Sequence, residues 1–242
     1  MIRVHTTANF VVGTNISLDE TASHRLRNVL KTPLHSQIQL FNDTGQVCEG
    51  MIVEFSRSTT TVQLTQTVDI NTESPLNVTL VQSVSRGDRM DYTLQKCVEL
   101  GVNKIIPVIS SRTVVRLDER KKTSRLKHWA GIVKHATEQS GRVKIAVIEK
   151  IESLENWANI PTESEIIILD PLADASLAKH TLTSPSVTIV AGPEGGFTKE
   201  ELGLLKKKKL SASVSLGPRT LRSETAAVCA MSILQALWGD LA

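Results

Sequence analysis

Short apolar runs that alternate with helical patterns constrain the fold of this chain more than any other feature. After Pro75, apolar runs occur at residues 78–84, 105–109, 166–169, 187–191 and 214–216. Helical patterns lie between them, at residues 86–100, where Gly101 marks the end, and at residues 126–137. This alternation predicts an α/β domain with a largely parallel sheet. Because such sheets bind ligands at the carboxyl ends of their strands, we expect function in the loops after Leu169, Ala191 and Leu216.

The first 72 residues predict a different, β-rich domain. Residues 38–41, 46–55 and 60–68 have strand patterns, and in the second of these Val47, Met51, Val53 and Phe55 are expected on one face. One helix is predicted, with a capping box of Ser17 and Glu20 and an apolar stripe of Ala22, Leu26, Val29 and Leu30. The polar residues 71–75 form a predicted linker, which divides the chain into domains 1–72 and 73–242.

Composition and charge narrow the class of protein. No run approaches the roughly 20 apolar residues of a membrane span, and no signal-peptide pattern begins the chain. Cys48, Cys97 and Cys229 lie far apart, which fits neither a disulfide framework nor a zinc site and predicts free thiols in a cytoplasmic protein with no metal. Residues 112–150 carry eleven Lys and Arg against four Asp and Glu. This basic segment suits a polyanion such as RNA, or is a solvated helix face.

Residues 192–197 (Gly-Pro-Glu-Gly-Gly-Phe) follow a predicted strand directly. Glycines allow a ligand to approach the backbone closely, although they also suit a simple tight turn. The next helix opens with a capping box of Thr198 and Glu201, flanked by Phe197 and Leu202 at the positions of a hydrophobic staple. The spacing matches neither a nucleotide P-loop nor a dinucleotide fingerprint.

Two more polar segments are candidates for binding. Residues 216–226 (LGPRTLRSETA) place Arg219, Arg222 and Glu224 around a glycine turn at the start of the last helix, where Ser223 could cap the helix. The arginines either form a site or are solvated at the surface. Residues 138–142 (EQSGR) end an earlier helix and either contact substrate or form an ordinary helix terminus.

Together these segments resemble a known family. Residues 86–90 (RGDRM), 96–102 (KCVELGV), 138–142, 192–197 and 216–226 are similar, in order and spacing, to motifs of the ribosomal RNA small subunit methyltransferase E family. This family belongs to the SPOUT superfamily of knotted methyltransferases and makes 3-methyluridine in 16S rRNA. Residues 24–31 (HRLRNVLK) match more weakly.

The resemblance implies a fold and a reaction. It implies a PUA-like β-barrel at residues 1–72 that helps to bind RNA, and a SPOUT domain at residues 73–242 with a trefoil knot that holds S-adenosyl-L-methionine. It also implies a homodimer that acts on 16S rRNA, within the small ribosomal subunit. The cofactor would contact Leu169, Gly192, Pro193, Glu194, Gly195, Gly196, Leu216, Gly217, Leu221 and Arg222. RNA would contact Arg3, Arg25, Arg27, Lys31, Arg86, Arg142 and Arg219.

The expected chemistry assigns three catalytic candidates. Uracil N3 carries a proton and is a poor nucleophile until that proton is lost. Arg222 could stabilise the uracil anion through its oxygens, and Glu194 or Glu224 could accept the proton. Two alternatives stay open: a SPOUT methyltransferase that acts on transfer RNA, and a ribosome assembly factor that binds RNA without catalysis.

Overall fold

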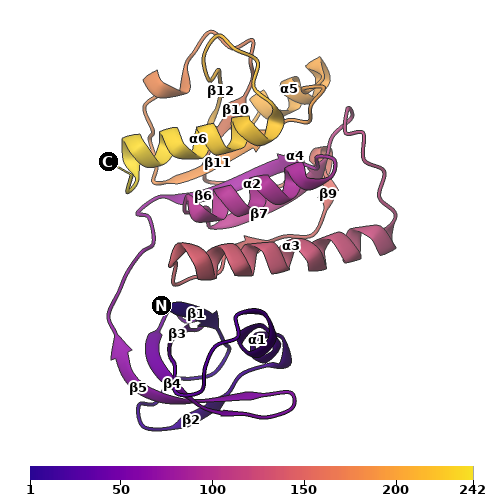
Figure 1. Cartoon of the computed structure of the whole chain (residues 1–242). Helices are drawn as coiled ribbons and strands as arrows, with labels where there is room; N and C mark the ends of the chain where they lie inside the picture. Colours follow the sequence, from indigo (N-terminus) through magenta and orange to yellow (C-terminus); the bar gives the residue numbers. More distant parts are fainter. Residues whose placement is uncertain (242) are drawn as a thin grey trace. The chain divides into compact units, whose positions relative to one another are not determined.

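The computed structural model describes residues 1–241, which divide into two compact units (Figure 1). The first unit consists of Met1–Glu73 together with Thr137–Ile145, and the second contains the rest of the described chain. The predicted domain boundary, between residues 72 and 73, lies one residue before the end of the segment Met1–Glu73. The prediction placed the boundary at one point in the chain and so did not assign residues 137–145 to the first unit.

The first unit is a five-stranded sheet in the order β1-β3-β4-β5-β2. β1 (Ile2–His5) pairs in parallel with β3 (Gln37–Phe41). The pairs that join β3 to β4 (Val47–Phe55), β4 to β5 (Thr60–Val68) and β5 to β2 (Asn15–Ser17) are antiparallel. The returning segment adds Val143 to a small apolar core that it shares with Phe41 and Val47.

Two local predictions for this unit are wrong. β4 buries Cys48, Gly50 and Ile52, which alternate along the strand, and Cys48 and Ile52 pack in the main core of the unit. Of the face that the sequence predicted, only Val47 is buried, in the small core with Phe41 and Val143.

The predicted helix also begins later than its sequence pattern indicated. α1 (Glu20–His24) is capped by Asp19, whose carboxylate accepts a hydrogen bond from the Ala22 amide, so Ser17 caps nothing and lies in β2. The helix continues as one π-helical turn, Arg25–Val29. Ala22 and Leu26 are buried, whereas Val29 and Leu30 are exposed.

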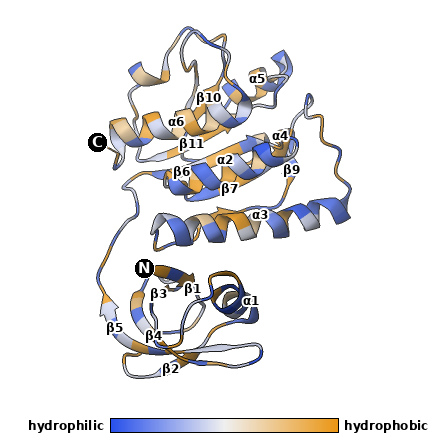
Figure 2. Ribbon diagram, viewed as in Figure 1, coloured by the Kyte–Doolittle hydropathy of each residue, from blue (hydrophilic) through white to orange (hydrophobic). Residues whose placement is uncertain are grey.

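The second unit has a seven-stranded sheet in which every pairing is parallel, as the alternation of strands and helices predicted. The order is β12 (Ser211–Val214), β10 (Glu165–Leu169), β11 (Ser186–Ala191), β6 (Asn77–Ser83), β7 (Lys104–Ile109) and β8 (Val147–Ile148), and β9 (Glu152–Ser153) also pairs with β7. Figure 2 shows the central strands β10 and β11 largely apolar, which fits strands buried on both faces of the sheet.

Helices cover this sheet. They are α2 (Asp88–Glu99), α3 (Glu119–Ser140), α4 (Leu154–Asn159), α5 (Lys199–Lys206) and α6 (Ser223–Trp238), of which the last turn of α3 counts with the first unit. The apolar face predicted for α2 is confirmed, because Met90, Leu94, Cys97 and Val98 are all buried. No helix within residues 1–241 is both long enough and apolar enough to cross a membrane.

Candidate functional site

A pocket of about 570 Å³ lies at the carboxyl edge of the parallel sheet, where the loops after β10, β11 and β12 meet. Its walls include all ten residues that were expected to contact the cofactor: Leu169, Gly192, Pro193, Glu194, Gly195, Gly196, Leu216, Gly217, Leu221 and Arg222. This is the edge at which parallel sheets place their ligands. The volume is within the range of about 300–1,000 Å³ that small-molecule sites occupy.

The glycine loop after β11 leads directly into α5, whose N-cap is Thr198. The Glu201 amide donates to the Thr198 hydroxyl, and the Thr198 amide donates to the Glu201 carboxylate, which completes the predicted capping box. A side chain at Gly192 would crowd the ring of Phe197, because its Cβ would lie 3.2 Å from the ring. The loop therefore presents backbone groups rather than side chains along this part of the pocket.

The start of α6 is attached to the same loop. The Ser223 hydroxyl donates a hydrogen bond to the Gly192 carbonyl at 2.6 Å, and the Gln82 amide nitrogen lies 2.9 Å from that hydroxyl. The sequence suggested that Ser223 caps α6, but the structure shows that it does not. Arg222 occupies the N-cap position, and its side chain makes no capping hydrogen bond. Arg222 and Arg219 are both exposed and line the pocket.

Arg89 joins the two candidate carboxylates. Its guanidinium lies 3.0 Å from a Glu194 oxygen and 3.8 Å from a Glu224 oxygen. Glu194 lines the pocket, whereas Glu224 is buried beside it and its Oε2 accepts no hydrogen bond from any residue in the range 1–241. Arg89 was not predicted as a site residue, although it lies in the RGDRM motif together with the predicted Arg86. Arg86 itself is exposed.

Arg112 is a second missed residue of this pocket. It lies in the loop after β7, lines the pocket, and donates a hydrogen bond to the Gly195 carbonyl at 2.8 Å. The neighbouring Ser111 amide donates to Glu201 at 2.7 Å. The basic composition of residues 112–150 was the available signal for Arg112, but composition does not reveal which arginine reaches the site.

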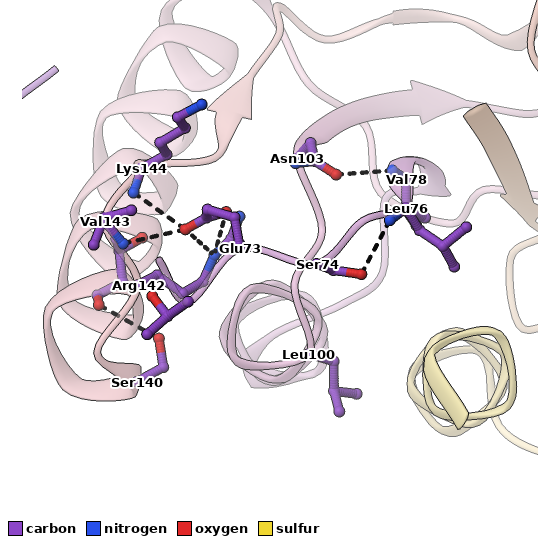
Figure 3. Close-up of polar contacts among 12 residues, drawn as sticks. Glu73, Ser74, Leu76, Val78, Leu100, Asn103, Ser140, Arg142, Val143 and Lys144 are labelled. Atoms are coloured by element: carbon purple, nitrogen blue, oxygen red, sulfur yellow. Dashed lines mark hydrogen bonds and ion pairs between the residues drawn. The ribbon is translucent and has the colours of Figure 1, made fainter. Parts of the chain in front are cut away.

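The structure gives several predicted RNA contacts other partners. Arg142, which was expected to contact RNA, is only 3% exposed, and its Nη2 lies 2.5 Å from Glu73, so its guanidinium is held within the first unit (Figure 3). Figure 3 also shows the Val143 and Lys144 amides donating to the Glu73 carboxylate. Residues 138–142 thus form part of the first unit rather than a substrate contact.

The other basic candidates of the first unit differ in their availability. Arg25 forms an ion pair with Glu138, and the Arg3 guanidinium stacks over the Phe41 ring at 5.2 Å. Arg27 is exposed while it donates to backbone carbonyls in the turn before β5. Lys31 is exposed and has a left-handed backbone, with φ of 49°. Within residues 1–241, no cluster of three His, Cys, Asp or Glu side chains could hold a metal ion.

Comparison with known proteins agrees with this arrangement. Residues 72–235 match the model of an RNA methyltransferase domain. The ribosomal RNA small subunit methyltransferase E of Buchnera aphidicola subsp. Schizaphis graminum is 31% identical over 93% of this chain and 92% of its own length. The enzyme of that name from Neisseria gonorrhoeae, solved bound to S-adenosyl methionine, is 36% identical, covers 100% of both chains and superposes with a TM-score of 0.94.

A methyltransferase from Legionella pneumophila, solved with the same cofactor, is 33% identical over 99% of both chains, with a TM-score of 0.95. The fold and the pocket therefore define an RNA methyltransferase. More specifically, the chain belongs to the ribosomal RNA small subunit methyltransferase E family.

Proposed function

We propose that this protein uses S-adenosyl-L-methionine to methylate N3 of a uridine in 16S rRNA. The observation that carries the proposal is the pocket, because its walls include every residue that the family resemblance assigned to the cofactor. The relatives named for small-subunit rRNA methylation support the reaction. One of them is solved with bound cofactor, as is the methyltransferase from Legionella pneumophila. The uridine and its N3 atom rest on the resemblance alone.

The pocket suits this cofactor chemically as well as in size. Leu169, Leu216 and Leu221 offer apolar surface for a flat ring, and the loop from Gly192 to Gly196 offers backbone groups. The cofactor supplies a methyl group on a sulfonium, which is a good leaving group. The tasks left to the protein are to exclude water, to align the uracil and to manage one proton.

The three charged candidates then take different roles. Arg222 can donate two hydrogen bonds to the oxygens of a uracil anion and so favours the reactive form of the base. Glu194 lines the pocket and is the carboxylate that a bound uracil can reach, so we assign it the N3 proton. Glu224 is buried, and we assign it the role of holding Arg89. Arg89 in turn fixes the Glu194 carboxylate.

The remaining parts of the proposal concern architecture. We propose that the second unit contains the trefoil knot of SPOUT proteins and that the first unit is a PUA-like barrel, as the resemblance implies. We further propose that the protein is a cytoplasmic homodimer whose small-residue helix α6 contributes to the interface. Arg219, Arg86, Arg27 and Lys31 remain candidates for contact with RNA, since all four are exposed.

The test is methylation of small ribosomal subunits that lack the modification. 3-Methyluridine is identified by mass spectrometry of the digested rRNA, and it blocks base pairing, so its position appears as a stop in reverse transcription. Glu194→Gln should lower the single-turnover rate while calorimetry shows cofactor binding retained. Cofactor binding without methylation of any small-subunit rRNA would instead favour the non-catalytic assembly factor, and methylation of transfer RNA alone would favour the other enzyme class.

A further inference from the structure

The outer face of α3 combines basic and small residues. Trp129, Val133 and Ala136 are buried and define the inner face of this 22-residue helix. Residues at spacings of three and four lie on the same side of a helix. On that basis the opposite side carries five residues, which we call the α3 stripe: Arg120, Ser124, Lys127, Gly131 and His135. From the first to the last of them, the stripe is about 22 Å long.

Other basic residues of α3 have partners within the protein. Lys121 pairs with Asp118 at 3.4 Å, and Lys122 pairs with Glu119 at 2.7 Å. Arg125 packs over the ring of Trp129.

The stripe has no such partners. Arg120 and Lys127 are exposed, and no carboxylate within residues 1–241 lies at ion-pair distance from either. The positive charge of α3 is therefore uncompensated along this one side, and the stripe accounts for part of the basic character of residues 112–150.

Gly131 is a second, independent feature of the stripe. Glycine in a helix interior is unfavourable relative to alanine, because it loses more backbone freedom on folding. Here a Cβ would have no atom within 4 Å, apart from the helix's own nearby backbone. Packing within this chain therefore gives no reason for the glycine. A residue without a side chain does, however, let an outside group come close to the helix backbone, between the positions of Lys127 and His135.

We propose that the α3 stripe binds the phosphate backbone of the RNA substrate, outside the methylation pocket. Charge complementarity identifies the partner, because phosphates pair with Arg and Lys regardless of base sequence. The small residues Ser124 and Gly131 leave room for the backbone between the cations. The inference rests on the proposed function for the identity of the RNA. It concerns a separate surface, however, and predicts an effect on RNA affinity rather than on the rate of methyl transfer.

The experiment measures RNA binding against salt concentration for two double variants of equal net charge. Arg120→Gln with Lys127→Gln removes two free cations, and the control, Lys121→Gln with Lys122→Gln, removes two that already have carboxylate partners. Each phosphate contact contributes about 0.7–0.9 to the slope of log affinity against log salt. The stripe variant should lower the slope by about 1.4–1.8 and weaken binding at least tenfold at about 0.1 M salt. Equal slopes for the two variants would overturn the proposal.

Gly131→Ala gives a test that misfolding cannot imitate. The alanine should raise the melting temperature, because it favours the helix and has free space within the chain. It should nevertheless weaken RNA binding, and Gly131→Gln should weaken it further. Unchanged RNA affinity in both variants refutes the proposal, and would be the result if the stripe instead met an acidic protein. At saturating RNA the single-turnover methylation rate should match that of the unmodified protein. If neither the variants nor the parent protein methylated RNA, the proposed function would be refuted. The salt dependence of RNA binding would still decide whether the α3 stripe binds RNA.

Discussion

Replacing Glu73 with alanine should destabilise the first unit selectively. The Glu73 carboxylate accepts hydrogen bonds from the Arg142 side chain and from the Val143 and Lys144 amides (Figure 3). Arg142 is only 3% exposed, so it cannot exchange this partner for water. Glu73→Ala therefore removes a carboxylate that is bound to a buried guanidinium, in the segment that returns to the first unit.

The size of the effect follows from that burial. Removing one partner of a buried ion pair costs about 3–5 kcal/mol, most of it the penalty of the unpaired charge. Since about 1.4 kcal/mol is a factor of ten, locally opened forms of the first unit should become more populated by a factor of about one hundred to a few thousand. The matched control is Glu149→Ala. Glu149 pairs with Lys104 at 3.5 Å, and both side chains are nearly half exposed, at 44% and 45%, so this pair should contribute about 0–1 kcal/mol.

Hydrogen exchange resolved by mass spectrometry can separate the two units. Fluorescence cannot follow the first unit, because Trp129, Trp157 and Trp238 all lie in the second. Glu73→Ala should accelerate exchange in β3, β4 and β5 and leave β6 and β11 nearly unchanged. If Glu73→Ala and Glu149→Ala gave the same exchange in β4 and β5, the assignment of residues 137–145 to the first unit as a stabilising element would fail.

Three further outcomes are expected. Gly195→Val should lower cofactor affinity at least tenfold in calorimetry with little change in melting temperature. The reason is that the Cβ of a valine here would lie 3.2 Å from Arg112, whose guanidinium holds the same loop. Equal cofactor affinity in the variant and the parent protein would contradict this. Arg222→Lys should lower the single-turnover methylation rate while RNA and cofactor binding persist, since lysine cannot copy the planar pair of donors; an unchanged rate would remove Arg222 from the chemistry. Burial raises the pKa of Glu165, but hydrogen bonds from Thr183 and His180 outweigh it and hold the pKa below its ordinary value. The stabilisation is therefore present above the ordinary glutamate pKa of about 4.3 and is lost as the pH falls through the folded value. Glu165→Gln should make the melting temperature less sensitive to acid below about pH 4, and an equally steep acid dependence would refute this.

Local sequence patterns predicted much of the fold, and for physical reasons. The central strands β10 and β11 are nearly continuous apolar runs because both faces of a parallel sheet are buried. Helix α5 begins at its predicted capping box because the two residues of the box are only three positions apart. The failures occur where two local signals compete. Asp19 caps α1 in place of Ser17, and β4 has apolar residues on both faces, of which Cys48 and Ile52 enter the main core and Val47 enters the smaller one.

The functional site was also predictable only in part. The loops of the pocket could be predicted, because each one is a continuous stretch of sequence that follows the end of strand β10, β11 or β12, with glycines after β11 and β12. The partners of the charged side chains were not. Arg89 meets Glu194 across 105 residues, and Arg142 meets Glu73 across 69 residues. Which arginine is neutralised within the protein depends on tertiary contacts, and no local pattern in a single sequence records them.

This distinction changes where RNA contact should be sought. A buried arginine that pairs with a carboxylate, as Arg142 does with Glu73, stabilises the fold and is not free to bind phosphate. In the first unit, Arg27 is exposed and donates to backbone carbonyls, not to a carboxylate, and Lys31 is exposed. On α3, Arg120 and Lys127 are exposed. A shortened chain that begins at Ser74 would therefore lose more than RNA affinity. It would also expose the Val143 side chain and leave Arg142 without its carboxylate, so a loss of activity on removal of the first unit does not by itself measure RNA binding. Substitution of the exposed cations one at a time, in the full chain, separates the two effects.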